Sequence, residues 1–193
     1  MLIASLSNNG GNRRILVVLL FAVAMLTVNL LLVRQNKSLK AYASKLDRSL
    51  ELKLGTPLPD LLGRDIQGNK LSIDYGSDAR RTILMVFSSG CGPCSENMKN
   101  WRALKNSCDA SKYRLVGVSL TPSGTAEFVA YHKMEGIPIM SEVDAKSRVD
   151  YNLTLTPQTI LIGPDGKTER VWSGVLSSGS TRAEVEHALN VRF

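Results

Sequence analysis

The stretch that decides the fold is Ile83-Leu84-Met85-Val86-Phe87-Ser88-Ser89-Gly90-Cys91-Gly92-Pro93-Cys94. Its first five residues are apolar and predict a short buried strand, and the next three predict a turn. A helix is expected over residues 95–106, so Cys91 is predicted to lie at a helix N-terminus. Unpaired backbone N–H groups and the helix dipole stabilise negative charge there, which favours the thiolate, the form of cysteine that attacks disulfides.

A zinc site or a static structural bridge is the alternative interpretation of Cys91 and Cys94. A structural zinc site needs four ligands, and beyond this pair the chain offers only Cys108, His132 and His187, none in paired ligand spacing. A CxxC pair beside alternating strands and helices is instead typical of thiol redox chemistry. We therefore expect redox-active cysteines and no bound metal.

Charge divides the 193-residue chain into two parts. Residues 1–54 carry eight Lys and Arg against two Asp and Glu, whereas residues 55–193 carry 16 against 15. The isoelectric point of about 9.5 therefore reflects the N-terminal part. Because no basic face is indicated for the remainder, we expect no nucleic-acid partner.

A membrane anchor is predicted between Arg14 and Arg34, where the 19 residues 15–33 carry no charge. A helix needs about 20 apolar residues to span a bilayer, whereas the apolar part of a cleaved signal peptide has about 7–15. Cleavage motifs of the small-x-small form occur at Ala22-Val23-Ala24 and Ala41-Tyr42-Ala43. The first interrupts the apolar run and basic residues surround the second, so an uncleaved anchor is favoured.

The two lines of evidence on membrane orientation disagree. More basic residues follow the span than precede it, which by the positive-inside rule would put the C-terminal part in the cytoplasm. A tethered CxxC domain with one further cysteine instead fits an extracytoplasmic thiol carrier. We expect a single-pass protein of the inner (cytoplasmic) membrane with its catalytic domain on the periplasmic side.

The predicted domain organisation has four parts. An N-terminal tail at 1–14 and the anchor precede a helical stalk at 34–54, and a globular domain follows at 55–193. Leu39 and Leu46 are seven residues apart, so a stalk-mediated dimer is an alternative. A solvated spacer is favoured because two heptads fall short of the three or four that identify a coiled coil.

Within the globular part, strands alternate with helices and finish in a hairpin, which predicts the α/β class with a mixed central sheet flanked by helices. We expect a hairpin over 66–73, an extended piece at 137–139, and strands over 82–87, 114–120, 159–162 and 168–173. Helices are expected over 95–106, 124–134 and 144–151. A last helix is expected from Thr181, the first residue of a capping box, to Val191.

This arrangement resembles the thioredoxin fold, and within it the membrane-anchored TlpA/ResA-like thiol-disulfide oxidoreductases of the redoxin (AhpC/TSA-like) superfamily. The likeness covers roughly residues 55–176. Four segments carry it: Gly55-Thr56-Pro57-Leu58-Pro59-Asp60, Phe87 to Cys94, Val116-Gly117-Val118-Ser119, and Thr156-Pro157-Gln158-Thr159-Ile160-Leu161-Ile162 with Asp165-Gly166-Lys167 behind it.

The resemblance implies an active-site disulfide between Cys91 and Cys94, with Cys91 as the nucleophile and Cys94 as the resolving cysteine. It also implies a cis peptide bond at Thr156-Pro157, facing that disulfide and holding an extended segment of the partner protein. The substrate-binding residues expected from the resemblance are Gly92, Pro93, Thr156 and Pro157.

Three residues depart from the family pattern. Thioredoxins carry a buried aspartate where this chain has Met85, and ResA-like members carry a glutamate where it has Asn97. Glu96 is one position earlier and, at about 100° per residue, should face elsewhere. Proton transfer to the second cysteine is thus without its usual acid. The aromatic residue that often precedes the first cysteine is Gly90, which predicts an open approach.

Gly92-Pro93 matches the dipeptide of reducing thioredoxins, so a reductase of protein disulfides is expected, in the maturation of extracytoplasmic proteins such as c-type cytochromes, with no cofactor. Two alternatives remain open. A peroxiredoxin-like peroxidase is one, although its Thr-x-x-Cys turn is absent; a copper-binding assembly factor is the other, although its cysteines are spaced by three residues. Cys108 is expected to be a free structural thiol.

Overall fold

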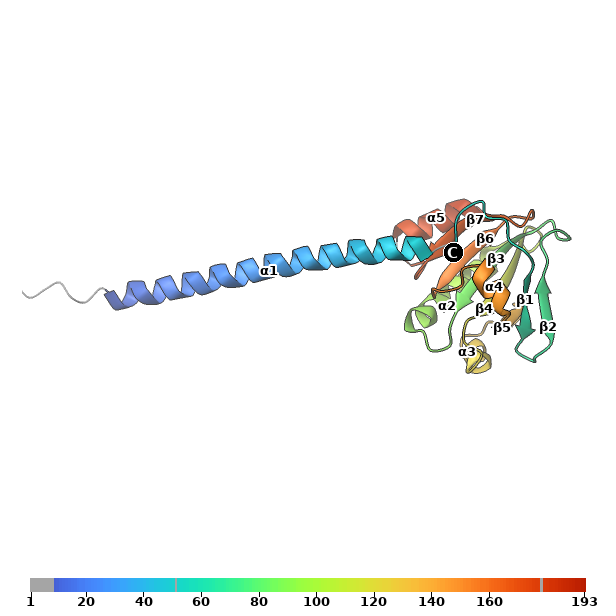
Figure 1. The fold of residues 1–193 in the computed structure, drawn as a ribbon, viewed down its shortest axis with the longest axis horizontal. Helices are drawn as coiled ribbons and strands as arrows, with labels where there is room; N and C mark the ends of the chain where they lie inside the picture. The colour runs from blue at the N-terminus through green and yellow to red at the C-terminus, as the bar shows by residue number, and fades with distance from the viewer. Residues whose placement is uncertain (1–8, 51, 178) are drawn as a thin grey trace, which may run out of the picture. The chain divides into compact units, whose positions relative to one another are not determined.

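A computed structural model of the chain describes residues 9–50, 52–177 and 179–193. The predicted tail at positions 1–8 and position 51 of the predicted stalk lie outside the described residues. The chain divides into two compact units, Met1–Arg48 and Ser49–Phe193 (Figure 1). The described residues of the first belong to one helix, and the second contains the sheet and all the cysteines.

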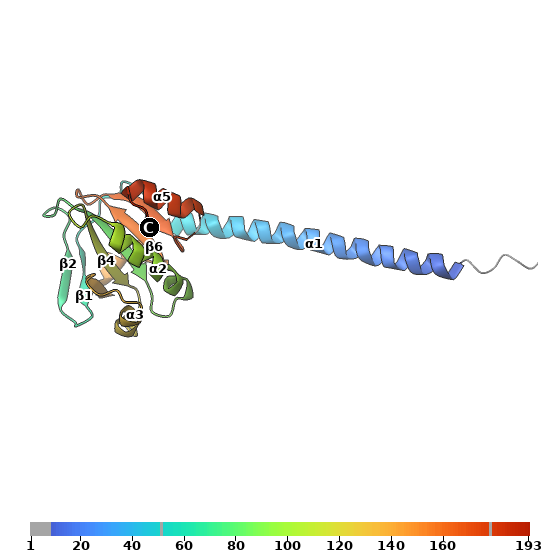
Figure 2. The same cartoon turned by 180° about the vertical axis from the view of Figure 1, so that it is seen from behind.

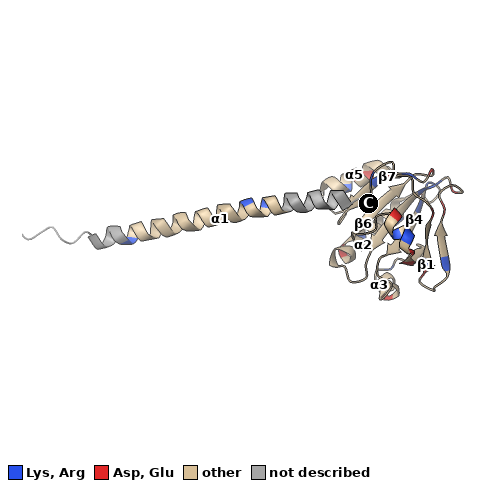
Figure 3. Cartoon of the chain, viewed as in Figure 1, with Lys and Arg blue, Asp and Glu red and all other residues tan. Residues whose placement is uncertain are grey.

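Helix α1 (Asn9–Leu50) is continuous over 42 residues. Its segment Arg14–Leu39 is long and apolar enough to cross a membrane, and none of its most apolar stretch is buried within the protein. In Figure 3 the ribbon is coloured for basic residues near both ends of this segment and for none along its middle. The predicted span and the first part of the predicted stalk therefore belong to the same helix.

A mixed sheet of seven strands in the order β2-β1-β5-β4-β3-β6-β7 forms the centre of the second unit. The middle strands β3, β4 and β5 are parallel, and the remaining pairings are antiparallel. The strands are β1 (Leu61–Asp65), β2 (Lys70–Ile73), β3 (Arg81–Phe87), β4 (Tyr113–Ser119), β5 (Ile139–Val143), β6 (Gln158–Ile162) and β7 (Thr168–Ser173).

Helices cover both faces of this sheet, as expected for the predicted class. The helices are α2 (Gly92–Ser107), α3 (Thr125–Tyr131), α4 (Ala145–Asp150) and α5 (Gly179–Leu189). Buried side chains of α2, α3 and α5 belong to one core cluster, and the residues just after α4 belong to the other. Figures 1 and 2 show α4 and α2 in front of the sheet in opposite views.

The apolar run of β3 supplies both core clusters. Met85 and Phe87 pack into the cluster on the α2 side, and Leu84 and Val86 into the cluster on the other side. All four side chains are fully buried. A central parallel strand covered on both faces explains why this stretch is uniformly apolar rather than alternating.

The predicted start of the first hairpin and the predicted end of the helix over 124–134 are both wrong, because the chain turns at each place. The hairpin begins at Leu61 rather than at residue 66, since Asp65 accepts hydrogen bonds from the backbone of Gln67 and Asn69 and ends β1 there. The helix predicted to run to residue 134 ends at Tyr131. Lys133 follows in the left-handed region at φ 52°, which does not continue a right-handed helix.

Two further boundaries also differ from the prediction. The extended piece expected at 137–139 is a strand at Ile139–Val143. The strand begins after Pro138, because proline has no backbone N–H to donate to a neighbouring strand. The last helix begins at Gly179, so Thr181 lies inside its first turn rather than at the N-cap, and it ends at Leu189. The strands expected at 159–162 and 168–173 agree with β6 and β7 to within one residue.

Helix α2 is fixed to the sheet by one buried hydrogen bond as well as by apolar contacts. Trp101 is fully buried, and its Nε1 donates to Oγ1 of Thr159 on β6 at 2.9 Å. This bond joins the helix that begins at the cysteine pair to the strand that follows Pro157.

We expect Thr159→Val to lower the free energy of unfolding by about 1–3 kcal/mol, because it leaves the buried Trp101 indole N–H without a partner at nearly constant volume. Urea denaturation followed by tryptophan fluorescence measures the change. Thr154→Val is the matched control, because Thr154 is exposed and should cost less than about 0.5 kcal/mol. Equal losses in the two variants would contradict the role of this bond.

Candidate functional site

Cys91 is the N-cap of α2, with extended backbone angles of φ −92° and ψ 109°. It follows β3 after the three-residue turn 88–90, and its backbone N–H donates to the carbonyl of Ser88 at 3.2 Å. Helical geometry starts at Gly92, and the first turn of α2 contains no acidic residue. The positive end of the helix dipole therefore faces Cys91 without a neutralising side chain on that turn.

The structure contains a disulfide between Cys91 and Cys94. Its two halves differ in exposure: the Cys91 side chain is partly exposed, whereas Cys94 is fully buried. The Cys94 backbone N–H donates to Cys91 Sγ at 3.2 Å. Gly92 and Pro93 between them are exposed. A molecule approaching from solvent can therefore reach Cys91 but not Cys94.

The segment before β6 lies beside this sulfur. Because β6 runs antiparallel to β3, its first residues meet the end of β3 where the disulfide is located. Cys91 Sγ lies 3.8 Å from the carbonyl oxygen of Thr156, and the Thr156–Pro157 peptide bond is cis. The backbone of Thr156 and the sulfur of Cys91 thus border one surface, with Thr156 partly exposed.

A second loop, residues 120–124, borders the turn before Cys91 and was not identified from the sequence. Ser89 Oγ donates to the Ser123 carbonyl at 2.8 Å, and Leu120 N–H donates to the Phe87 carbonyl at 2.8 Å. Gly124 adopts φ 73° and lies close enough to Ser89 that an added Cβ would be about 3.3 Å from its Oγ. Only glycine adopts this conformation readily.

The three departures from the family pattern are at Met85, Asn97 and Gly90, and Gly90 is exposed. Met85 is fully buried beneath α2, and Asn97 is also fully buried. Glu96 is exposed, as its helical position predicted. Neither carboxylate position of the related proteins is therefore occupied by an acid that faces Cys94.

Cys108 is a free thiol at the far end of α2. Burial raises the pKa of Cys108 to about 11, so this thiol is almost entirely protonated at neutral pH and is a poor nucleophile.

Within the described residues, no group of three or more His, Cys, Asp or Glu side chains is arranged to hold a metal ion.

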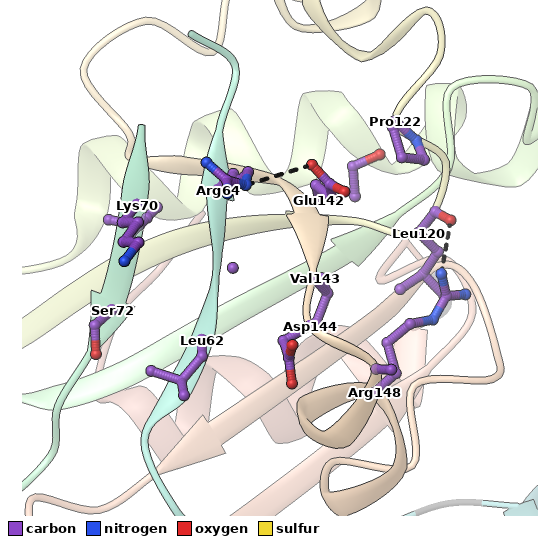
Figure 4. Close-up of a pocket in the computed structure, with 14 residues that line it drawn as sticks. Leu62, Arg64, Lys70, Ser72, Leu120, Pro122, Glu142, Val143, Asp144 and Arg148 are labelled. Carbon is purple, nitrogen blue, oxygen red and sulfur yellow. Dashed lines mark hydrogen bonds and ion pairs between the residues drawn. The ribbon is translucent and has the colours of Figure 1, made fainter. Parts of the chain in front are cut away.

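A hollow of about 870 Å³ opens over β1, β2 and β5 and the loop after β4 (Figure 4). Arg64 Nε lies 4.0 Å from Glu142 Oε2, and Arg148 donates to the Leu120 carbonyl. The walls of the hollow contain basic, acidic and apolar side chains. Neither cysteine of the disulfide lines it, so the disulfide lies outside this hollow.

These features define a thioredoxin-fold protein with a disulfide at the N-terminus of its second helix. The sequence profile of the AhpC/TSA family matches residues 54–171. This match covers more than half of the chain, and the chain therefore belongs to the AhpC/TSA family.

Individual relatives are more distant. Sporulation thiol-disulfide oxidoreductase A of Bacillus subtilis (strain 168) is 22% identical over 122 residues, which are 61% of this chain and 72% of that protein. The crystal structure of StoA from Bacillus subtilis has a TM-score of 0.52 at 21% identity, and covers 69% of this chain and 98% of that one.

Two further solved structures share the fold. A putative thiol:disulfide interchange protein DsbE from Chlorobium tepidum has a TM-score of 0.56 at 20% identity, and the match covers 72% of this chain and 98% of that chain. A peroxiredoxin-like protein from Aquifex aeolicus has a TM-score of 0.53 at 15% identity, and the match covers 64% of this chain and 77% of that chain. The predicted thioredoxin-like fold is confirmed, and the predicted enzyme class, thiol-disulfide oxidoreductase, is supported.

Proposed function

We propose that this chain is a membrane-anchored thiol-disulfide reductase that acts on disulfides of extracytoplasmic proteins, with c-type cytochromes among the expected substrates. The observation that carries the proposal is the difference in exposure across the disulfide: Cys91 is accessible at a helix N-terminus, and Cys94 is fully buried behind it. The AhpC/TSA family membership and the names of the related proteins support the same chemistry.

In the proposed mechanism, reduced Cys91 attacks one sulfur of a partner disulfide as a thiolate. A mixed disulfide forms between Cys91 and the partner, and the second partner sulfur leaves as a thiolate that takes up a proton from solvent. Cys94 then attacks Cys91 Sγ and releases the first partner sulfur. The partner gains two electrons and two protons, and the Cys91–Cys94 disulfide is restored.

Substrate binding is assigned to Gly92, Pro93, Thr156 and Pro157, of which Pro157 is buried. The two residues of the turn are exposed, and the Thr156 carbonyl lies within 3.8 Å of the reactive sulfur. An extended segment of the partner can pair with backbone at this edge while its own sulfur approaches Cys91, in the manner of strand addition. Affinity then depends mainly on backbone contacts, which suits a reductase with several substrates.

The two alternative functions have less support. A peroxidase is compatible with the AhpC/TSA family, but the chain lacks the Thr-x-x-Cys turn expected for the peroxidatic cysteine. A copper-binding factor requires a histidine beside both cysteines, and the described residues contain no such three-ligand group. A dimer formed through the stalk remains a prediction.

We expect Cys94→Ser to accumulate partner proteins in mixed disulfides with Cys91, because the resolving sulfur is gone while the attacking sulfur stays accessible. Non-reducing gels of the variant, followed by mass spectrometry of the adducts, measure this. Cys108→Ser is the matched control and should form no adducts and keep wild-type reductase activity. Adducts that persist in Cys91→Ser/Cys94→Ser, or full activity of Cys91→Ser, would refute the assignment of the nucleophile.

The extracytoplasmic position of the catalytic domain is the second part of the proposal. Its support is the apolar helical segment Arg14–Leu39 together with a dithiol that is suited to an oxidising compartment. We expect a reporter enzyme that is active only outside the cytoplasm to be active when it is fused after Phe193. The same reporter fused after Arg14, before the span, is the control and should be inactive; the reverse pattern would contradict this orientation.

A further inference from the structure

Asn97 lies one helical turn after Cys94 on the buried face of α2. Both side chains are fully buried. Residues three apart on a helix are neighbours, with their Cβ atoms about 5–6 Å apart. Asn97 and Cys94, the buried half of the disulfide, therefore lie on the same face of α2, one turn apart.

The orientation of the Asn97 carboxamide is fixed by its partners. The backbone N–H of Leu176 can only donate, and it lies 2.9 Å from Asn97 Oδ1. Asn100 Nδ2 donates to the same oxygen at 3.0 Å. The oxygen is thus held from two sides, and the amide nitrogen must occupy the other position.

Asn97 Nδ2 is buried and has no hydrogen-bond partner among the described residues. A buried donor without a partner is costly, and such groups call for an explanation. The sulfur of Cys94 in the disulfide is neutral and a weak acceptor. The donor is therefore unoccupied in the oxidised protein, one helical turn from the residue whose sulfur must become a thiolate during the reaction.

Cys94 also needs a partner more than Cys91 does. Cys91 Sγ accepts from the Cys94 backbone N–H and lies at the helix N-terminus. For Cys94, burial disfavours the thiolate. The buried residues Met85 and Asn97 carry no acid, and the side chain of Glu96 is exposed.

We propose that Asn97 Nδ2 donates a hydrogen bond to the Cys94 thiolate in the mixed-disulfide state and thereby sets the pH range in which Cys94 resolves it. This inference rests on the proposed function. The amide transfers no proton: the Cys94 thiol loses its proton to water, the amide N–H stabilises the resulting thiolate, and that thiolate attacks Cys91 Sγ. A hydrogen bond to the charged form favours ionisation.

A stopped-flow reaction with an aromatic disulfide whose thiolate absorbs visible light tests this on the full-length protein carrying Cys108→Ser. Reduced Cys91 releases one aromatic thiolate in a first phase, and Cys94 releases the second in a later phase. The pH at which the second phase reaches half its maximal rate reports the ionisation of Cys94. The first phase reports Cys91 in the same experiment.

Two substitutions remove the donor in different ways. Asn97→Asp keeps an oxygen for Leu176 and Asn100 but replaces the N–H donor with a carboxylate, whose negative charge also opposes ionisation of Cys94. Asn97→Leu removes both the acceptor oxygen and the N–H donor and adds no charge. We expect both to raise the second-phase midpoint by about one to two pH units, the size of a hydrogen bond to a charged group, and to leave the first-phase midpoint unchanged.

Two controls separate this effect from a structural one. Asn100→Ala removes a bond to Asn97 Oδ1 but leaves the donor, and Trp172→Phe removes another unpartnered buried N–H of the same core cluster. Neither should move the second-phase midpoint. The inference is overturned if both Asn97 variants keep the wild-type midpoint, or if either control shifts it as far. A wild-type protein without a second phase would overturn the proposed function itself.

Discussion

The junction between β3 and α2 is the constraint on which the site depends. A buried strand ends at Phe87 and a helix starts at Gly92, so only four residues turn the chain and Cys91 must cap the helix. The same geometry exposes Cys91 and buries Cys94 one turn further on. The difference in reactivity between two chemically identical side chains therefore follows from where a strand stops and a helix begins.

The mixed sheet supplies the second part of the site. Since β6 is antiparallel to β3, Thr156 reaches the end of β3 and lies beside Cys91. The parallel neighbour β4 brings the loop 120–124 to the same edge. The bond from Trp101 to Thr159 fixes α2 against β6. Three segments distant in sequence thus meet at the turn that ends in Cys91.

Local patterns predicted the elements that carry the chemistry, and tertiary contacts determined the rest. The apolar run before Cys91, the buried face of α2 and the strands β6 and β7 are recognisable because their periodicity extends over several residues. The end of α3 depends on the left-handed conformation of Lys133, and the turn at Asp65 on side-chain bonds. The unoccupied amide of Asn97 depends on the backbone of Leu176, which is 79 residues away in sequence. From the sequence alone, Asn97 could be recognised only as a residue that stands where related proteins have a glutamate.

The central claim is that this disulfide serves reduction rather than oxidation of partner proteins. Its most direct test is the reduction potential of the Cys91–Cys94 pair, obtained by equilibrating the full-length protein with dithiothreitol or glutathione buffers and quantifying the free dithiol. The account predicts a value near that of thioredoxin, about −270 mV. A value near that of a strong oxidant, about −120 mV, would contradict it.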